Sequence, residues 1–196
     1  MTKPIGAIIL AAGFSSRFEG SKLLASLNDE RTVFQQTCER IAEAFPARLV
    51  VTRPELCDVL QAYAPHTEVK RFDDAERGLG ATLAYAMQHI GDWEGCVVCL
   101  GDMPFILPST YRLIAEKLTS ASIVIPMKDG TAGNPVAFGS RHFAELAALD
   151  GDSGGKRIVQ RHEDSVLHLP VDDPGILQDI DTQAQLAHYQ NSQAKP

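Results

Sequence analysis

The chain has no long hydrophobic run, no block of basic residues and no regular cysteine spacing. No apolar stretch in its 196 residues approaches the length that spans a bilayer, and residues 1–4 lead into a predicted strand without resembling a signal peptide. The net charge of −7 and the lack of a basic cluster argue against nucleic acid as the main partner. We therefore expect a cytoplasmic protein that acts on neither membranes nor nucleic acid.

The four cysteines do not form a disulfide or zinc framework. Cys96 and Cys99 make a C-x-x-C pattern, but they lie in an apolar run that is predicted to be a strand. Residues three apart in a strand point to opposite faces, so the two thiols should diverge. We interpret both as buried core cysteines, which fits a reducing compartment.

Several common catalytic signatures are also missing. The sequence contains neither the Walker pattern nor G-x-G-x-x-G, and the serines near Gly13 lack the spacing of a nucleophile elbow. The six histidines show no metal-ligand intervals, and each is interpreted as a surface or partly satisfied side chain. Transfer at a phosphate would still be possible, because positioning, charge neutralisation and a metal carry most of that chemistry.

Short apolar segments alternate with helical patterns along the chain. The predicted strands are residues 5–10, 48–52, 68–72, 96–100, 122–126 and 166–169. The predicted helices are residues 32–45, 55–64, 79–90, 109–118 and 183–189. This alternation predicts a doubly wound, mostly parallel α/β sheet in a single domain over residues 1–190, followed by a frayed polar tail at 191–196.

Ligands of such sheets bind at the carboxyl ends of the strands. We therefore expect the loops after Leu10, Phe72, Leu100 and Pro126 to surround one cleft. Residues 128–161 interrupt the alternation with many glycines and are interpreted as an insertion that carries substrate contacts.

The most informative segment follows the first predicted strand. After Leu10 the chain continues with small residues and hydroxyls, and then with Arg17, Gly20 and Lys22. Small residues let backbone amides approach an anion, while the two cations supply fixed positive charge. The pattern favours a loop that binds a triphosphate; an ordinary strand-to-helix turn is the alternative.

Aspartates in two motifs could hold a metal ion. Asp102 follows Gly101 at the end of a predicted strand, and Mg²⁺ prefers one or two carboxylates with phosphate oxygens and water. Asp179 and Asp181 share one face if their segment is extended. The alternatives are a turn at Asp102 and a helix N-cap at Asp181. The pairs at 73–74 and 172–173 are interpreted as solvated loop residues.

Taken together, the motifs resemble the nucleotidyltransferases of the molybdenum-cofactor group, which includes a cytidylyltransferase and a guanylyltransferase. The matching segments are Leu10-Ala11-Ala12-Gly13 with Ser15, Arg17, Gly20 and Lys22; Gly101-Asp102-Met103-Pro104; Gly133-Asn134-Pro135-Val136; Asp152-Ser153-Gly154-Gly155-Lys156; and Asp179-Ile180-Asp181-Thr182. The resemblance implies a Rossmann-like nucleotidyltransferase fold, dependence on Mg²⁺, and attack of a molybdopterin phosphate on the α-phosphate of a triphosphate, with release of pyrophosphate.

The resemblance also implies roles for individual residues. Arg17, Lys22 and Asp102 would be catalytic, with Asp102 and Asp181 as the metal ligands. The nucleotide would contact Leu10, Ala11, Ala12, Gly13, Ser15, Arg17, Lys22, Gly78, Thr82, Gly101 and Asp102. The acceptor would contact Gly133, Asn134, Pro135 and Lys156.

The resemblance also bears on which nucleotide base and which acceptor the protein uses. Guanylyl members tend to carry a second glycine where this chain has Ala12, so the resemblance favours CTP over GTP. The chain departs from the family in two places: Asn134 stands where cytidylyl members usually carry histidine, and Glu19 lengthens the phosphate loop.

Three hypotheses follow from the sequence. The first is a molybdopterin cytidylyltransferase that serves a molybdenum hydroxylase through transient contact. The second is a nucleotidyltransferase that uses GTP or a different phosphorylated acceptor. The third is a non-catalytic chaperone for the cofactor, although a binding module has less need of two metal carboxylates.

Overall fold

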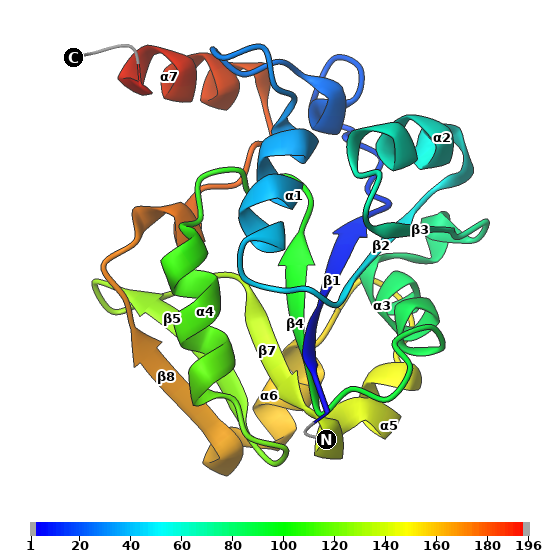
Figure 1. The fold of residues 1–196 in the computed structure, drawn as a ribbon, viewed down its shortest axis with the longest axis vertical. Helices are drawn as coiled ribbons and strands as arrows, with labels where there is room; N and C mark the ends of the chain where they lie inside the picture. Colours follow the sequence, from blue (N-terminus) through cyan, green and yellow to red (C-terminus); the bar gives the residue numbers. More distant parts are fainter. Residues whose placement is uncertain (1–2, 194–196) are drawn as a thin grey trace.

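A single mixed sheet organises the protein (Figure 1). The computed structural model describes residues 3–193, with side chains described for residues 3–190. The strands are β1 (Ile5–Ala11), β2 (Arg48–Thr52), β3 (Glu68–Arg71), β4 (Gly95–Leu100), β5 (Ile123–Lys128), β6 (Thr131–Ala132), β7 (Val136–Gly139) and β8 (Val166–Pro170). All six predicted strands are therefore present, with ends that shift by one or two residues.

The strand order is β3-β2-β1-β4-β7-β5-β6, and β8 pairs with β5. Neighbours among β1 to β4 pair in parallel, as does β8 with β5, whereas β7 runs antiparallel to both β4 and β5. The mostly parallel, doubly wound α/β prediction is confirmed. The sequence analysis missed β6 and β7, because these strands are short and lie in the glycine-rich region 128–161.

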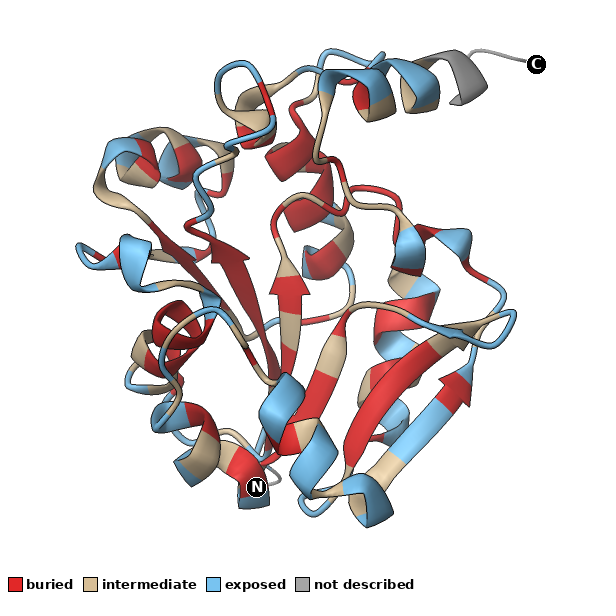
Figure 2. Cartoon of the chain, turned by 180° about the vertical axis from the view of Figure 1, so that it is seen from behind, coloured by how far each residue is buried: buried red, intermediate tan, exposed pale blue. Residues whose placement is uncertain are grey.

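Helices cover both faces of the sheet. The α-helices are α1 (Val33–Ala42), α2 (Pro54–Tyr63), α3 (Leu79–Met87), α4 (Pro108–Lys117), α5 (Phe143–Ala147), α6 (Lys156–Arg161) and α7 (Gln183–Gln193). Side chains of α1, α2 and α4 share one apolar cluster with the strands, and those of α3, α5 and α6 share another. Figure 2 shows buried strands between helices whose outer faces are exposed.

The two apolar clusters explain the cysteine pattern. Cys99 belongs to the cluster under α1, α2 and α4, while Cys96 belongs to the cluster on the opposite face. Both thiols are buried, and burial raises the pKa of Cys96 to about 12. The expectation that the C-x-x-C pattern marks two diverging core thiols is therefore met.

The carboxyl-terminal segment differs from the expected frayed tail in one respect. Helix α7 extends to Gln193, so residues 191–193 are helical, and residues 194–196 lie outside the described part of the chain. Among the described residues, no helix combines the length and the apolar character needed to cross a bilayer.

Asp173 corrects the interpretation of residues 172–173 as a solvated pair. Asp172 is exposed, but Asp173 is only 2% exposed and accepts three hydrogen bonds. Its carboxylate binds the backbone N–H of Leu107 at 2.8 Å, the hydroxyl of Thr110 at 2.6 Å and the N–H of Gly175 at 2.9 Å. Asp173 therefore joins the start of α4 to the chain after β8.

We predict that Asp173→Ala lowers the free energy of unfolding by about 3 kcal/mol, because three donors lose a charged acceptor in a buried site. Urea denaturation measures this effect. Asp172→Ala is the matched control and should change stability by less than about 0.5 kcal/mol. Equal effects of the two substitutions would contradict the assignment.

Candidate active site

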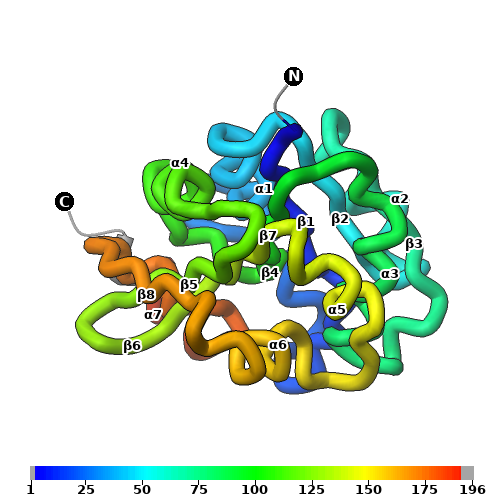
Figure 3. The backbone as a smooth tube through the Cα atoms, turned by 90° about the horizontal axis from the view of Figure 1, so that it is seen from below, coloured from blue at the N-terminus to red at the C-terminus, as the bar shows by residue number. Residues whose placement is uncertain are grey.

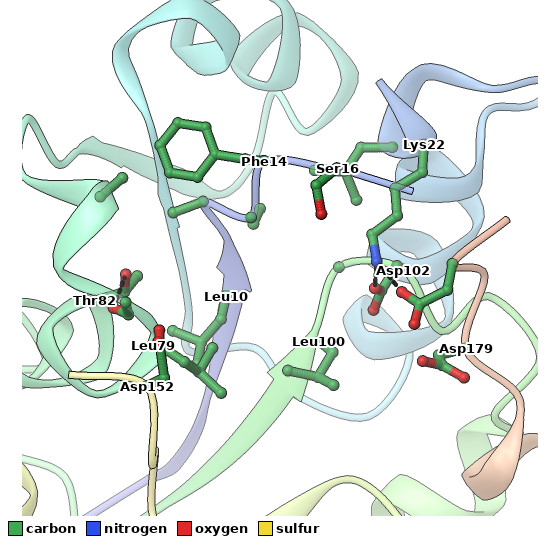
Figure 4. Close-up of a pocket in the computed structure, with 18 of the residues that line it drawn as sticks. Leu10, Phe14, Ser16, Lys22, Leu79, Thr82, Leu100, Asp102, Asp152 and Asp179 are labelled. Carbon is green, nitrogen blue, oxygen red and sulfur yellow. Dashed lines mark hydrogen bonds and ion pairs between the residues drawn. The ribbon is translucent and has the colours of Figure 1, made fainter. Parts of the chain in front are cut away.

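A cleft of about 480 Å³ lies where β1 and β4 end (Figure 4). Its lining residues are Leu10, Ala11, Ala12, Gly13, Phe14, Ser16, Lys22, Leu23, Ala75, Glu76, Gly78, Leu79, Thr82, Leu100, Gly101, Asp102, Asp152, Asp179 and Asp181. The loops after β1, β3 and β4 therefore meet at one cleft, as expected. The loop after Pro126 contributes to an adjoining pocket instead.

Glycine and alanine allow β1 and β4 to end side by side. A Cβ atom on Gly101 would lie 3.3 Å from the Ala11 Cβ and 3.4 Å from the Leu10 carbonyl oxygen. The N–H of Gly101 also donates to that carbonyl at 3.0 Å. Small residues at these positions thus bring Asp102 next to the loop that follows β1.

Lys22 connects the two acidic motifs. Its Nζ lies 2.5 Å from Asp102 Oδ2 and 2.6 Å from Asp181 Oδ1, and all three side chains are largely buried. Burial disfavours the ammonium, but the two carboxylates outweigh it and raise the pKa of Lys22. Figure 4 shows the amino group of Lys22 directly beside Asp102, on the same side of the cleft. The cationic loop and the acidic motifs therefore meet.

The segment that carries Asp179 and Asp181 is fixed by Ile180. The Ile180 side chain is fully buried, and its N–H donates to the Asp102 carbonyl oxygen at 3.1 Å. The carboxylates on either side of it both line the cleft. This arrangement matches the alternation predicted about Ile180, although the segment is not part of a strand.

The carboxylates fit a hard divalent cation. Asp102 Oδ1 is buried and has no hydrogen-bond partner within the described part of the chain. Burial, and then the charges of Asp181 and Asp102, raise the pKa of Asp179. The hydrogen bond from Lys22 lowers the pKa of Asp181. Oxygen donors with an unsatisfied carboxylate oxygen are the set that Mg²⁺ prefers.

Asp181 is not the cap of α7. The hydroxyl of Thr182 accepts from the Gln185 N–H at 3.2 Å, and the Gln185 side-chain oxygen accepts from the Thr182 N–H at 2.9 Å. This reciprocal pair caps the helix start. The carboxylate of Asp181 is thereby free to bind Lys22 and Arg17.

Arg17 and Ser15 lie at the edge of the site. The Arg17 guanidinium lies 2.5 Å from Asp181 Oδ2, yet its side chain is 71% exposed. Ser15 has a positive φ of 52°, and its buried hydroxyl has no partner among the residues that the structure describes. Neither residue is among the described residues that line the cleft. The structure thus does not place Ser15 in the cleft.

The wall opposite Lys22 contains Gly78 and Thr82. Gly78 has a φ of +96°, and a Cβ there would lie 2.1 Å from Asp152 Oδ1. The Gly80 N–H donates to the Gly151 carbonyl oxygen at 2.7 Å. Glycine at these positions lets the loop before α6 pack on the start of α3, which places Asp152 in the cleft wall.

Most of the predicted acceptor residues lie in the adjoining pocket, which has a volume of about 360 Å³. Gly133, Asn134 and Lys156 line it together with apolar side chains. Pro135 is not among its described lining residues, and the Asn134–Pro135 peptide bond is cis. The two pockets share Leu10, Leu79 and Leu100, so they are continuous.

Sequence reasoning missed some residues of the site. Asp152 and Phe14 line the cleft without having been assigned a role at the nucleotide. Arg53 stacks over the Phe14 ring at 5.0 Å and donates to the Gly13 carbonyl oxygen at 2.8 Å. The position of Arg53 after β2 was the available signal, because the carboxyl ends of neighbouring parallel strands meet at one edge.

Comparisons with known proteins agree with this geometry. The family model of the MobA-like NTP transferase domain matches residues 7–180. The bifunctional protein GlmU of Acidiphilium cryptum is 30% identical over 139 residues, which is 68% of this chain and 30% of that protein. The chain therefore spans about a third or less of the length of the curated relatives that it matches.

Solved structures match over the whole fold. Rv0371c of Mycobacterium tuberculosis superposes with a TM-score of 0.86 at 28% identity, covering 97% of this chain and 99% of that one. Its complex with manganese gives a TM-score of 0.82 at 25% identity, covering 97% of this chain and all of the other. The fold, the converging cation and carboxylates, and the match over residues 7–180 show that this chain belongs to the MobA-like NTP transferase family.

Proposed function

We propose that the protein transfers CMP from CTP to the phosphate of a molybdopterin-type acceptor and releases pyrophosphate. The observation that carries the proposal is the convergence of Lys22, Asp102 and Asp181 in the cleft after β1 and β4. A cation for the phosphates and carboxylates for a divalent metal are what transfer at an α-phosphorus requires.

The residues of the cleft have separate roles in this reaction. Lys22, together with Arg17 at the rim, neutralises the triphosphate, while the backbone of Ala12 and Gly13 lies beneath it. An acceptor phosphate oxygen attacks the α-phosphorus as the bond to pyrophosphate breaks. No general base is needed, because a phosphate is already ionised at neutral pH.

Asp102 and Asp181 would hold Mg²⁺. The bound ion would supply charge neutralisation at the phosphates and orient the leaving pyrophosphate. Because Lys22 contacts both carboxylates, we expect its ammonium group to shift toward the triphosphate when a metal ion binds.

The adjoining pocket supports an acceptor with a planar, partly apolar body. Leu83, Val98, Ile125 and Phe138 line it, whereas Lys156 and Asn134 offer polar contacts at its surface. A pterin ring fits this mixture better than a sugar, which needs many hydrogen-bonding groups. Its phosphate would then face the cleft shared with the nucleotide.

Ala12 supports a pyrimidine base. It is 6% exposed and lines the cleft, so its methyl group would narrow the space beside a base bound there. One methyl group discriminates by about 1–3 kcal/mol. Transient delivery of the product to a molybdenum hydroxylase and a cytoplasmic location complete the proposal. The four described thiols are free, as expected in a reducing compartment.

The direct test is pyrophosphate release from each NTP with Mg²⁺, with and without molybdopterin. We predict release with CTP and acceptor together, and a loss of at least about a hundredfold in Asp102→Ala. Asp58→Ala on the exposed face of α2 is the control and should keep full activity.

Folding of Asp102→Ala is checked by thermal unfolding, since Lys22 keeps Asp181 as a partner. Release with another acceptor or with GTP would overturn the substrate assignment. Nucleotide binding without turnover would instead support a cofactor chaperone.

Ala12→Gly tests the base assignment. We predict that the ratio of kcat/KM for CTP to that for GTP falls by about tenfold or more, because removal of the methyl group opens space for a purine. Ala62→Gly removes a methyl group from the exposed face of α2, away from the cleft, so this ratio should not change. An unchanged ratio in Ala12→Gly would contradict the argument.

Asp179→Asn tests the division of roles among the carboxylates. Its raised pKa means that ionised Asp179 destabilises the fold at pH values above its folded pKa. In EDTA at pH 7 the variant should melt about 1–3 °C higher than wild type. At pH 3, where both folded and unfolded forms are protonated, the difference should vanish.

Asp58→Asn is the control for this measurement and should leave Tm unchanged. If Asp181 is the second ligand, Asp179→Asn retains most of the Mg²⁺-dependent activity, whereas Asp181→Asn loses it. The reverse pattern would exchange the roles of the two aspartates.

A further inference from the structure

Two histidines and a glutamate come together at the end of the sheet away from the active site. His142 ends the short 3₁₀-helix Ser140–His142, Glu145 lies in α5, and His162 follows α6. One potential ligand atom from each lies within 4.8 Å of the others. Figures 1 and 3 show α5 and α6 next to each other, at the lower end of the sheet in Figure 1.

The hydrogen bonds of His142 fix its tautomer. Its ring is 2% exposed, and Nε2 lies 3.2 Å from the carbonyl oxygen of Ala121. A carbonyl only accepts, so Nε2 carries a proton, which leaves Nδ1 as the ring nitrogen that could bind a ligand. This buried Nδ1 has no partner among the described residues. A ligating histidine is commonly fixed by a carbonyl in this way.

The other two side chains lie next to the His142 ring. The His162 ring centre is 4.9 Å from that of His142, and His162 Nε2 lies 2.5 Å from Glu145 Oε1. The second Glu145 oxygen accepts from Arg161 at 2.6 Å. This arrangement satisfies His162 and Glu145 without a ligand, but it leaves the buried His142 Nδ1 unsatisfied. Buried polar atoms without a partner are uncommon in folded proteins, so this nitrogen is a candidate ligand atom.

We propose that His142, Glu145 and His162 form a binding site for a transition-metal ion such as Zn²⁺. Two imidazoles and one carboxylate are a common three-ligand set for zinc, with water in the remaining position. Imidazole donors favour zinc over magnesium, whereas the carboxylate set of the active site favours magnesium. The two sites therefore select different ions.

The location gives the site a structural consequence. Glu145 and His162 lie at the two ends of the segment that contains the loop before α6. That loop forms part of the active-site wall, where Asp152 meets Gly78. A metal ion bound by both Glu145 and His162 would hold this loop against α3 and reduce the amplitude of its motion.

Titration with Zn²⁺ in excess Mg²⁺ tests the proposal, because Mg²⁺ competes with Zn²⁺ for the carboxylates of the active site. We expect calorimetry to show that one equivalent of Zn²⁺ binds. The Tm should rise by about 5–10 °C when the free Zn²⁺ concentration is a hundred times Kd. Glu145→Gln and His162→Ala should each lose most of this rise. His168→Ala removes an exposed histidine of β8 and should retain it.

Cobalt substitution identifies the ligands independently of stability. Co²⁺ in wild type and in His168→Ala should give one visible absorption band of a nitrogen-ligated ion, which should be absent in His162→Ala. Absence of Zn²⁺ binding to wild type would overturn the proposal. An equal rise in Tm in wild type and His162→Ala would place the ion elsewhere and overturn it as well.

Discussion

The ion pairs of Lys22 with Asp102 and Asp181 are the interaction on which the site depends. They join the loop after β1, the end of β4 and the segment before α7, which are far apart in the sequence. Leaving any of these charges unpaired in a largely buried position would cost free energy, so each holds the others in place. A triphosphate with a metal ion can replace these pairs, because it offers anions to Lys22 and a cation to the aspartates.

The fold brings these groups together through small residues. The parallel strands β1 and β4 end at one edge, and Gly101 beside Ala11 allows their loops to approach closely. Buried Ile180 anchors the third segment to the backbone of Asp102. The chain thus creates an acidic edge, lined by Asp102, Asp179 and Asp181, in a protein that belongs to the MobA-like NTP transferase family.

The sequence predicts those features that depend on the local order of residues. Alternation of apolar strands and helices predicts the sheet, and the loop containing Arg17 and Lys22 predicts a phosphate site next to Asp102. Contacts between residues that are far apart in the sequence could not be predicted, because they depend on the tertiary structure. Asp173 looks like its exposed neighbour Asp172, yet it binds donors more than sixty residues away. His142 and His162 are twenty positions apart, and only the packing of α5 beside α6 brings them together.

A crystal structure with Mg²⁺ and a non-hydrolysable CTP analogue tests the central claim most directly. We expect one cleft in which Asp102 and Asp181 coordinate the ion while Lys22 has moved from these carboxylates to the triphosphate. Binding of the nucleotide outside this cleft, or an unchanged Lys22 pair with the ion held by other residues, would contradict it.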